Sequence, residues 1–184
     1  MHIHIKYFGA IISSCFFVLI FTVNGCSRIP NKVTPELQVV PYVDIERYLG
    51  KWYEIALYPN WFEKGCFAST AFYEKLADGK IGVTNKCRMH RPDGEVNVAI
   101  GKAVVADIKS NAKLKVQFFW PFKGDYWIIG LDKDYQYAIV SEPERQYLWI
   151  LSRSPEMETE TLEMLKEKIK LNGFDLTYLQ LTVH

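Results

Sequence analysis

The sequence predicts an all-β protein, an eight-stranded antiparallel up-and-down barrel with one C-terminal α-helix packed outside it and a short final strand. Eight runs of β-forming residues follow one another from residue 48 onward, separated by turns rich in Gly, Pro, Asn and Asp. Several runs alternate polar and apolar residues, as strands with one buried face do. After residue 154 the apolar spacing changes once to a helical period. Eight antiparallel strands can close a barrel that holds one small ligand.

Residues 1–25 have the composition of a secretory signal peptide. Their single charge, Lys6, precedes an uncharged apolar run that ends at Gly25, directly before Cys26. A Cys after a small residue resembles the lipobox of bacterial lipoproteins, although Asn24 departs from that pattern. The resemblance implies that Cys26 becomes the acylated first residue, and Ser27 after it implies sorting to the outer membrane. The alternative is an uncleaved transmembrane anchor, for which the apolar run is barely long enough.

Residues 26–43 contain three prolines and little periodicity, which predicts an extended tether between the lipid and the domain. The domain itself is expected to span residues 44–184. Several acyl chains on one residue hold a protein stably at a bilayer, whereas a single chain does not. We therefore expect the outer-membrane bilayer to be a partner of the chain, through acylated Cys26, with the domain in the periplasm.

The first strand begins at Gly50, where the backbone can approach closely, and continues through Trp52. Alternation assigns one set of its side chains to the inner face, namely Trp52, Glu54, Ala56 and Tyr58. Glu54 would then be a buried carboxylate, which requires a partner because unpaired burial of charge is costly. Arg153 and a tyrosine hydroxyl are both candidates for that partner.

The other strands are expected at regular intervals, each bounded by a turn. In the run from Lys113 to Phe118 the apolar residues alternate strictly with polar ones and should face inward. The predicted ranges are residues 67–75, 80–88, 95–107, 113–119, 125–132, 136–140 and 147–153.

A single amphipathic helix is predicted over residues 155–171. Ser154 suits the N-cap, Pro155 the first helical position, and Asn172-Gly173 the stop. Its apolar stripe would cover one outer patch of the barrel, and residues 174–183 would return as the short final strand.

Four cysteines occur in the chain, at positions 15, 26, 66 and 87. Cys15 would leave with the signal peptide and Cys26 would carry lipid, so Cys66 and Cys87 are the candidate disulfide. The pair flanks a hairpin turn but is about four residues out of register, so a bulge would have to absorb the difference. The alternative is two free thiols, one of which could act as a nucleophile.

The charge balance excludes some classes of partner. The formal net charge is +1, and no basic stripe appears that would favour nucleic acid. Only His90 and His184 remain after removal of the signal, and neither has a Ser, Asp or Cys beside it in a catalytic order. We expect no metal, no cofactor and no catalytic residue.

Three motifs follow one another along the chain: residues 50–52, residues 131–135 with 138–140, and residues 148–153. Together they resemble the lipocalin family, specifically its bacterial outer-membrane lipoproteins and apolipoprotein D. The resemblance extends from Tyr48 to about Phe174 and includes further aromatic and cysteine-containing blocks. It implies that Arg153 lies across the ring of Trp52 at the closed end of the barrel, a cation–π contact of about 0.5–2 kcal/mol. Gly50, Trp52 and Arg153 are thus expected to determine the fold and not to contact ligand.

If one end is closed, the other should open into an apolar calyx that suits an acyl chain. For the strand near residue 126 the sequence does not fix which of two aromatic residues points inward. The candidate lining residues are Ala56, Tyr58, Leu114, Val116, Phe118, Tyr126, Trp127, Tyr147, Trp149 and Leu151.

The resemblance implies fatty acid or lysophospholipid as ligand, and a role in storing or transporting lipids for outer-membrane maintenance. Aromatic residues in two predicted loops, Trp61-Phe62 and Trp120-Pro121-Phe122, are expected to rim the mouth and to enter lipid. Two other functions stay open: a lipocalin-fold enzyme that uses a free thiol, and a structural lipoprotein with a filled barrel. A homodimer is also left open by the sequence.

Overall fold

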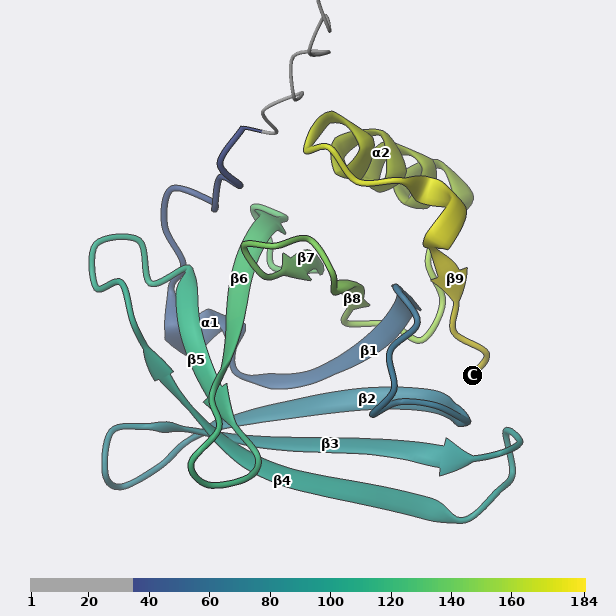
Figure 1. Ribbon diagram of the computed structural model, residues 1–184, viewed down its shortest axis with the longest axis horizontal. Coiled ribbons are helices and arrows are strands. Elements are labelled where there is room, and N and C mark those ends of the chain that lie inside the picture. The colour runs from purple at the N-terminus through teal and green to yellow at the C-terminus, as the bar shows by residue number, and fades with distance from the viewer. Residues whose placement is uncertain (1–34) are drawn as a thin grey trace, which may run out of the picture. The chain divides into compact units, whose positions relative to one another are not determined.

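The computed structural model describes residues 35–184, which form one compact unit with nine strands (Figure 1). The predicted signal peptide and the predicted lipidation site, Cys26, lie outside the described residues. In residues 35–184 no helix is both long and apolar enough to span a bilayer. The elements in chain order are α1 (Ile45–Tyr48), β1 (Gly50–Leu57), β2 (Cys66–Lys75), β3 (Ile81–Met89), β4 (Val96–Val105), β5 (Lys113–Gln117), β6 (Gly124–Leu131), β7 (Tyr137–Ser141), β8 (Leu148–Ser152), α2 (Thr159–Leu171), the 3-10 turn η1 (Leu176–Tyr178) and β9 (Gln180–Leu181).

The first eight strands form a closed antiparallel barrel, which confirms the predicted fold class. Each strand from β1 to β8 pairs with the next, and β8 returns to pair with β1. The strand β9 is added outside this order, on the edge of β1 beyond its pairing with β2. Figure 1 shows β9 beside β1, at the side of the barrel on which α2 lies.

Two hydrophobic clusters correspond to the two faces of the curved sheet. The interior cluster contains Trp52, Leu114 and Val140, all at most 4% exposed. The outer cluster joins β1, β6, β7 and β8 to α2, whose Leu165 and Ile169 are buried against the strands. A strand that is apolar on both faces therefore has a partner on each side.

The helix α2 begins four residues later than the sequence predicts. Ser154 and Pro155 lie in a bend that precedes the helix, and Glu158 is the N-cap, although its side chain makes no capping hydrogen bond. The predicted end is confirmed: Asn172 caps the last turn through its backbone, and Gly173 follows with a φ of 86°.

Part of the predicted tether packs against the barrel. Leu37 is buried in the outer cluster and Val43 in the interior cluster, at 2% and 0% exposure. The backbone of Val43 also donates a hydrogen bond to the carbonyl of Ser110, at 2.7 Å. The short helix α1, which the sequence did not reveal, follows at once and is capped by Asp44, whose Oδ1 accepts from the backbone of Glu46.

Candidate ligand-binding barrel

The base of the barrel is the end at which β1 begins. Trp52 closes this end, and Arg153 lies over its ring. Trp52 has no exposed surface, and the guanidinium carbon of Arg153 lies 3.8 Å from the centroid of its ring. The same guanidinium donates hydrogen bonds to four backbone carbonyls around the indole. Its partners are the carbonyls of Lys51 and Arg47, both at 2.8 Å, and of Tyr48 and Tyr135, both at 3.2 Å. Trp52 and Arg153 therefore fasten the start of β1 to the end of β8.

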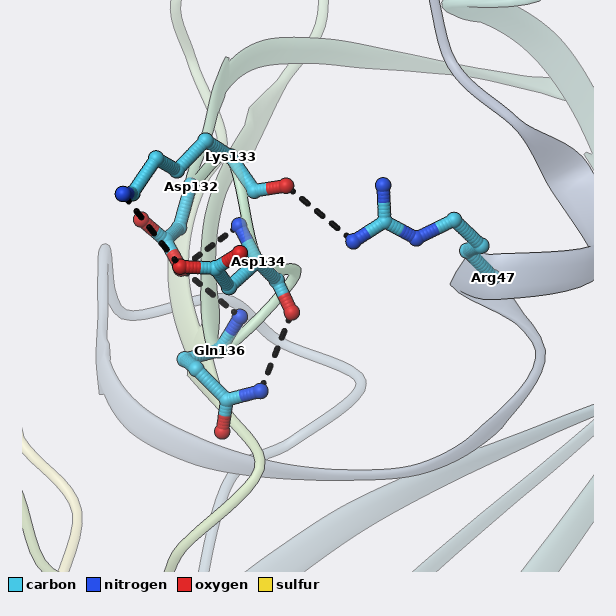
Figure 2. A network of polar contacts seen from close by, with 5 residues as sticks. All are labelled: Arg47, Asp132, Lys133, Asp134 and Gln136. Carbon is cyan, nitrogen blue, oxygen red and sulfur yellow. Dashed lines mark hydrogen bonds and ion pairs between the residues drawn. The ribbon is translucent and has the colours of Figure 1, made fainter.

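The turn between β6 and β7 completes this closed end (Figure 2). Asp132 Oδ2 accepts hydrogen bonds from the backbone of Asp134 and Gln136, which holds the turn in shape. Arg47 of α1 donates to the carbonyl of Lys133 at 3.1 Å, and its guanidinium carbon lies 4.1 Å from the ring centroid of Tyr135. The residues of the second motif thus lie at the base of the barrel, far along the chain from the first but close to it in space.

Most of the predicted lining residues do lie inside the barrel. Leu114, Val116, Phe118, Tyr126, Trp149 and Leu151 belong to or pack against the interior cluster. Tyr147 stacks on Trp149, with centroids 5.9 Å apart and an interplanar angle of 21°.

Three predicted lining residues lie instead on the outer face: Ala56, Tyr58 and Trp127. The physical reason in β1 is a bulge after Glu54, where the pairing with β8 steps from Glu54–Leu151 to Ala56–Ile150. The extra residue puts both Ile55 and Ala56 on the outside and shifts every later residue by one face. Leu57, opposite Trp149, is therefore the inward residue that alternation missed.

Trp127 faces outward because Tyr126, its neighbour in the strand, faces inward. Its indole lies under the ammonium of Lys113, 3.9 Å from the ring centroid, and donates to Asp125. A second bulge follows in β6, between Ile128 and Gly130, so this strand too cannot be assigned throughout by simple alternation.

Three tyrosines form a hydrogen-bonded chain in the interior above Trp52. The hydroxyl of Tyr126 lies 2.8 Å from that of Tyr48 and 2.9 Å from that of Tyr73. Burial raises the pKa of all three phenols, so they remain neutral over the physiological range. No sequence pattern indicates this cluster, because its members come from three separate elements: the last residue of α1, β2 and β6.

The loop after β1, residues 58–65, covers part of the mouth. Phe62 lies 5.6 Å from Tyr147 and 6.4 Å from Trp149, measured between ring centroids. Trp149 Nε1 donates to Glu63 Oε2 at 3.1 Å, and Asn60 donates to the same oxygen, at 2.5 Å. These contacts connect the loop to the upper wall of the barrel.

Glu54 is buried inside the barrel, as alternation predicts, but neither predicted partner bonds it. Its Oε1 accepts a hydrogen bond from Thr182 Oγ1 at 2.6 Å, and Arg153 is engaged at the closed end. Burial, and then the negative charge of Glu63, raise the pKa of Glu54 to about 8. The shift favours the protonated form of this carboxyl at neutral pH.

A disulfide joins Cys66 at the start of β2 to Cys87 in β3, with an S–S distance of 2.05 Å. The β2–β3 pairing contains a bulge between Phe67 and Thr70, with Ala68 at a φ of 48°. It takes up only part of the offset in register, because Cys66 lies opposite Met89 and the disulfide reaches diagonally to Cys87. Neither sulfur is a free thiol here, which removes the one nucleophile that an enzymatic function would have used.

Two hollows lie on the outer surface. One, of about 260 Å³, is lined by residues of β1 to β4 together with His184, and the other, of about 460 Å³, lies beside Phe174 and η1. At the mouth of the barrel, Phe62 packs on Tyr147 and Trp149.

This arrangement of an eight-stranded barrel, a base of Trp under Arg and a single outer helix defines a lipocalin-type binding protein. The chain belongs to the lipocalin family: the family described as "Lipocalin-like domain" matches residues 43–184. The resemblance inferred from the motifs is thereby confirmed, and proteins of this family are generally binding proteins without catalytic activity.

Relatives from bacteria, plants and mammals match most of the chain. The chain is 41% identical over 160 residues to the outer membrane lipoprotein Blc of Escherichia coli K12, covering 85% of this chain and 87% of the relative. It is 42% identical over 156 residues to temperature-induced lipocalin-1 of Arabidopsis thaliana, covering 80% and 82%. Mouse apolipoprotein D is 36% identical over 152 residues, which is 77% of each chain.

Solved structures agree on the fold alone. Insecticyanin from the tobacco hornworm Manduca sexta superposes with a TM-score of 0.65 at 22% identity, covering 82% of this chain and 85% of that one. Lobster apocrustacyanin A1 has a TM-score of 0.61 at 18% identity, covering 85% and 93%.

Proposed function

We propose that this protein is a lipid-anchored lipocalin that binds fatty acids or lysophospholipids and stores or transports them for maintenance of the outer membrane. The observation that carries the proposal is the apolar inner face of a barrel that is closed at one end by Trp52 and Arg153. Leu57, Leu114 and Trp149 lie on that face. Each methylene buried against such a surface contributes about 0.8 kcal/mol, so an acyl chain is the natural occupant.

Entry of an acyl chain into the barrel would require the loop of residues 58–65 to move. Phe62 is 47% exposed and packs on Tyr147 and Trp149 without being buried, so little apolar surface holds the loop down. The hydrogen bonds to Glu63 would break while the loop is open and form again when it closes over the bound lipid.

The localisation belongs to the same proposal. Cys26 would carry the lipid, and the matched relatives include proteins named outer membrane lipoproteins from Vibrio cholerae and Citrobacter freundii. The domain would then lie in the periplasm, with the mouth loops close to the bilayer. Trp61 is 79% exposed and Trp120 is 87% exposed, and Phe119 and Phe122 beside it are exposed as well. Exposed aromatic side chains grouped in this way favour a membrane interface.

The contact with lipid can be tested on the full chain reconstituted in liposomes. Brominated lipids should quench tryptophan fluorescence, and the quenching should fall strongly in a W61F/W120F variant. As a control, Trp127→Phe removes an indole from the outer wall below the mouth and should leave the quenching almost unchanged. Equal quenching in all three proteins would exclude insertion of these loops.

A second function is favoured by the packing at the mouth. Phe62 packs on Tyr147 and Trp149, which also fits a structural lipoprotein whose barrel is filled by its own side chains. Titration of the full chain, in nanodiscs, with a fluorescent lysophospholipid separates the two. A carrier gives saturable binding that Val116→Trp blocks by filling the interior, whereas a filled barrel gives no saturable binding above that of empty nanodiscs.

A further inference from the structure

Four polar side chains face the barrel interior above Trp52, and each presents an oxygen acceptor. Glu54 lies opposite Leu151 of the interior cluster and is 5% exposed. Asn85 of β3 lies opposite Ala71, which also packs against that cluster. Ser69 of β2 is 7% exposed, and Glu63 reaches the interior from the mouth loop, where it bonds Trp149.

The hydrogen bonding of this group is incomplete. Within residues 35–184, Ser69 Oγ and Asn85 Oδ1 are buried with no hydrogen-bond partner. The Ser69 hydroxyl lies close enough to the carboxyl of Glu54 to lower its pKa, yet it has no hydrogen bond of acceptable geometry. A buried polar atom without a partner costs about 1–3 kcal/mol, so such atoms in native proteins are normally bonded by a water or a ligand.

The charge of the group is also unbalanced. No ion pair among the described residues includes Glu54 or Glu63. The groups that donate to the two carboxyls are all neutral: Thr182 Oγ1, Trp149 Nε1 and Asn60 Nδ2. Burial, and to a smaller extent the negative charge of Glu63, raise the pKa of Tyr73, so this neighbour is neutral and supplies no cation either. Two acids thus share the interior without a cation.

We propose that Glu54, Glu63, Ser69 and Asn85 form a subsite for a primary ammonium group, the head of an amphiphile whose alkyl chain lies in the barrel. This inference rests on the proposed function and specifies the class of ligand. An ammonium has three donors and no acceptor, so it fits a site made of acceptors. It would take the place of the proton between the two carboxyls, whereas the carboxylate of a free fatty acid would meet charge of its own sign.

Calorimetric titration of the full chain in phosphatidylcholine nanodiscs tests the proposal, with the heat from empty nanodiscs subtracted. The probes are octylammonium, octanoate and octan-1-ol, which share one chain length, and ethanolamine, which has the amine but no chain. At pH 7 octylammonium should bind at least about tenfold more tightly than octanoate, equivalent to about 1.4 kcal/mol. Ethanolamine should bind far more weakly, because the chain supplies most of the affinity.

Binding should also release a proton. Without ligand, the pair of Glu54 and Glu63 holds a proton on Glu54 at neutral pH. An ammonium group would displace this proton because it favours the ionised carboxyl. Repeating the titration in buffers with different ionisation enthalpies measures this proton.

The E54Q/E63Q variant should lose both the tenfold preference and the proton release, while its affinity for octan-1-ol stays within about twofold, equivalent to about 0.4 kcal/mol. Glu74→Gln is the matched control, because Glu74 lies in β2 next to the inward Tyr73 and is exposed on the outside. If the double variant loses cooperative unfolding, Glu63→Gln alone decides, with the same expected loss of preference.

The outcomes separate this inference from the proposed function. Equal binding of octylammonium, octanoate and octan-1-ol would overturn the ammonium subsite and leave the carrier intact. If ethanolamine bound as tightly as octylammonium, the claim that the ligand is an amphiphile would be wrong. Failure of every chain-bearing probe to bind would contradict the proposed function itself.

Discussion

Replacement of Arg153 by Ala should destabilise the barrel by about 3 kcal/mol. The cation–π contact with Trp52 accounts for about 1 kcal/mol of this, since the pair is partly shielded from water. Of the four carbonyls that the guanidinium bonds, those of Arg47 and Lys51 are exposed, so water can replace the lost donor. The carbonyls of Tyr48 and Tyr135 are partly buried, and each lost bond should cost about 1 kcal/mol.

Equilibrium unfolding in urea, followed by tryptophan fluorescence, measures this loss. Arg153→Lys keeps the charge but not the planar fork of donors, and should recover less than half of the stability. Arg91→Ala is the control, because its ion pair with Asp93 is exposed and should be worth less than about 0.5 kcal/mol. If the Ala variants at 153 and 91 were equally stable, Arg153 would not hold the base of the barrel as described.

Three further predictions follow from the same structure. Replacing Cys66 and Cys87 by Ala removes a link across 21 residues and should cost about 3 kcal/mol in urea unfolding, with the wild type and variant equal under reducing conditions. Because the pKa of Glu54 is about 8 in the folded protein and 4.5 without the fold, the folded state binds more protons between these values. Stability should therefore fall as the pH rises from about 4.5 to about 8, and Glu54→Gln should flatten the profile. Ile169→Ala should cost about 2–4 kcal/mol because this side chain of α2 is fully buried against the strands, whereas Leu171→Ala, at 86% exposure, should cost almost nothing in thermal unfolding.

Several outcomes would contradict these predictions. A disulfide variant as stable as the oxidised wild type would show that the link constrains nothing. A pH profile that keeps its slope in the Glu54 variant would assign the titration to another group. Equal losses at 169 and 171 would mean that α2 does not cover the outer cluster.

The strand order could be predicted from the sequence because turns punctuate it. Gly79, Gly94 and Asn111 lie in turns between consecutive strands, and all eight predicted runs lie within a few residues of an observed strand. The pairing of Trp52 with Arg153 was accessible only through the family motifs, since nothing local connects two residues a hundred positions apart.

The facing of individual residues was less predictable, and the reason is the bulges. One inserted residue at Ile55 reverses every later assignment in β1, which is why Tyr58 proved to lie under the C-terminal segment, its hydroxyl donating to the carbonyl of Asp175. The sequence carries no Gly or Pro at that bulge to announce it. The partner of Glu54 was missed for a different reason: Thr182 directly follows β9, and its distance in sequence from β1 conceals the contact.

The central claim, that the barrel holds an amphiphile, is tested most directly by native mass spectrometry of the full chain released from its own membrane. We expect one non-covalent amphiphile per protein, which is lost on collisional activation and is absent from a Val116→Trp variant. A protein that carries no such adduct, and gains none when mixed with excess lysophospholipid, would contradict the claim.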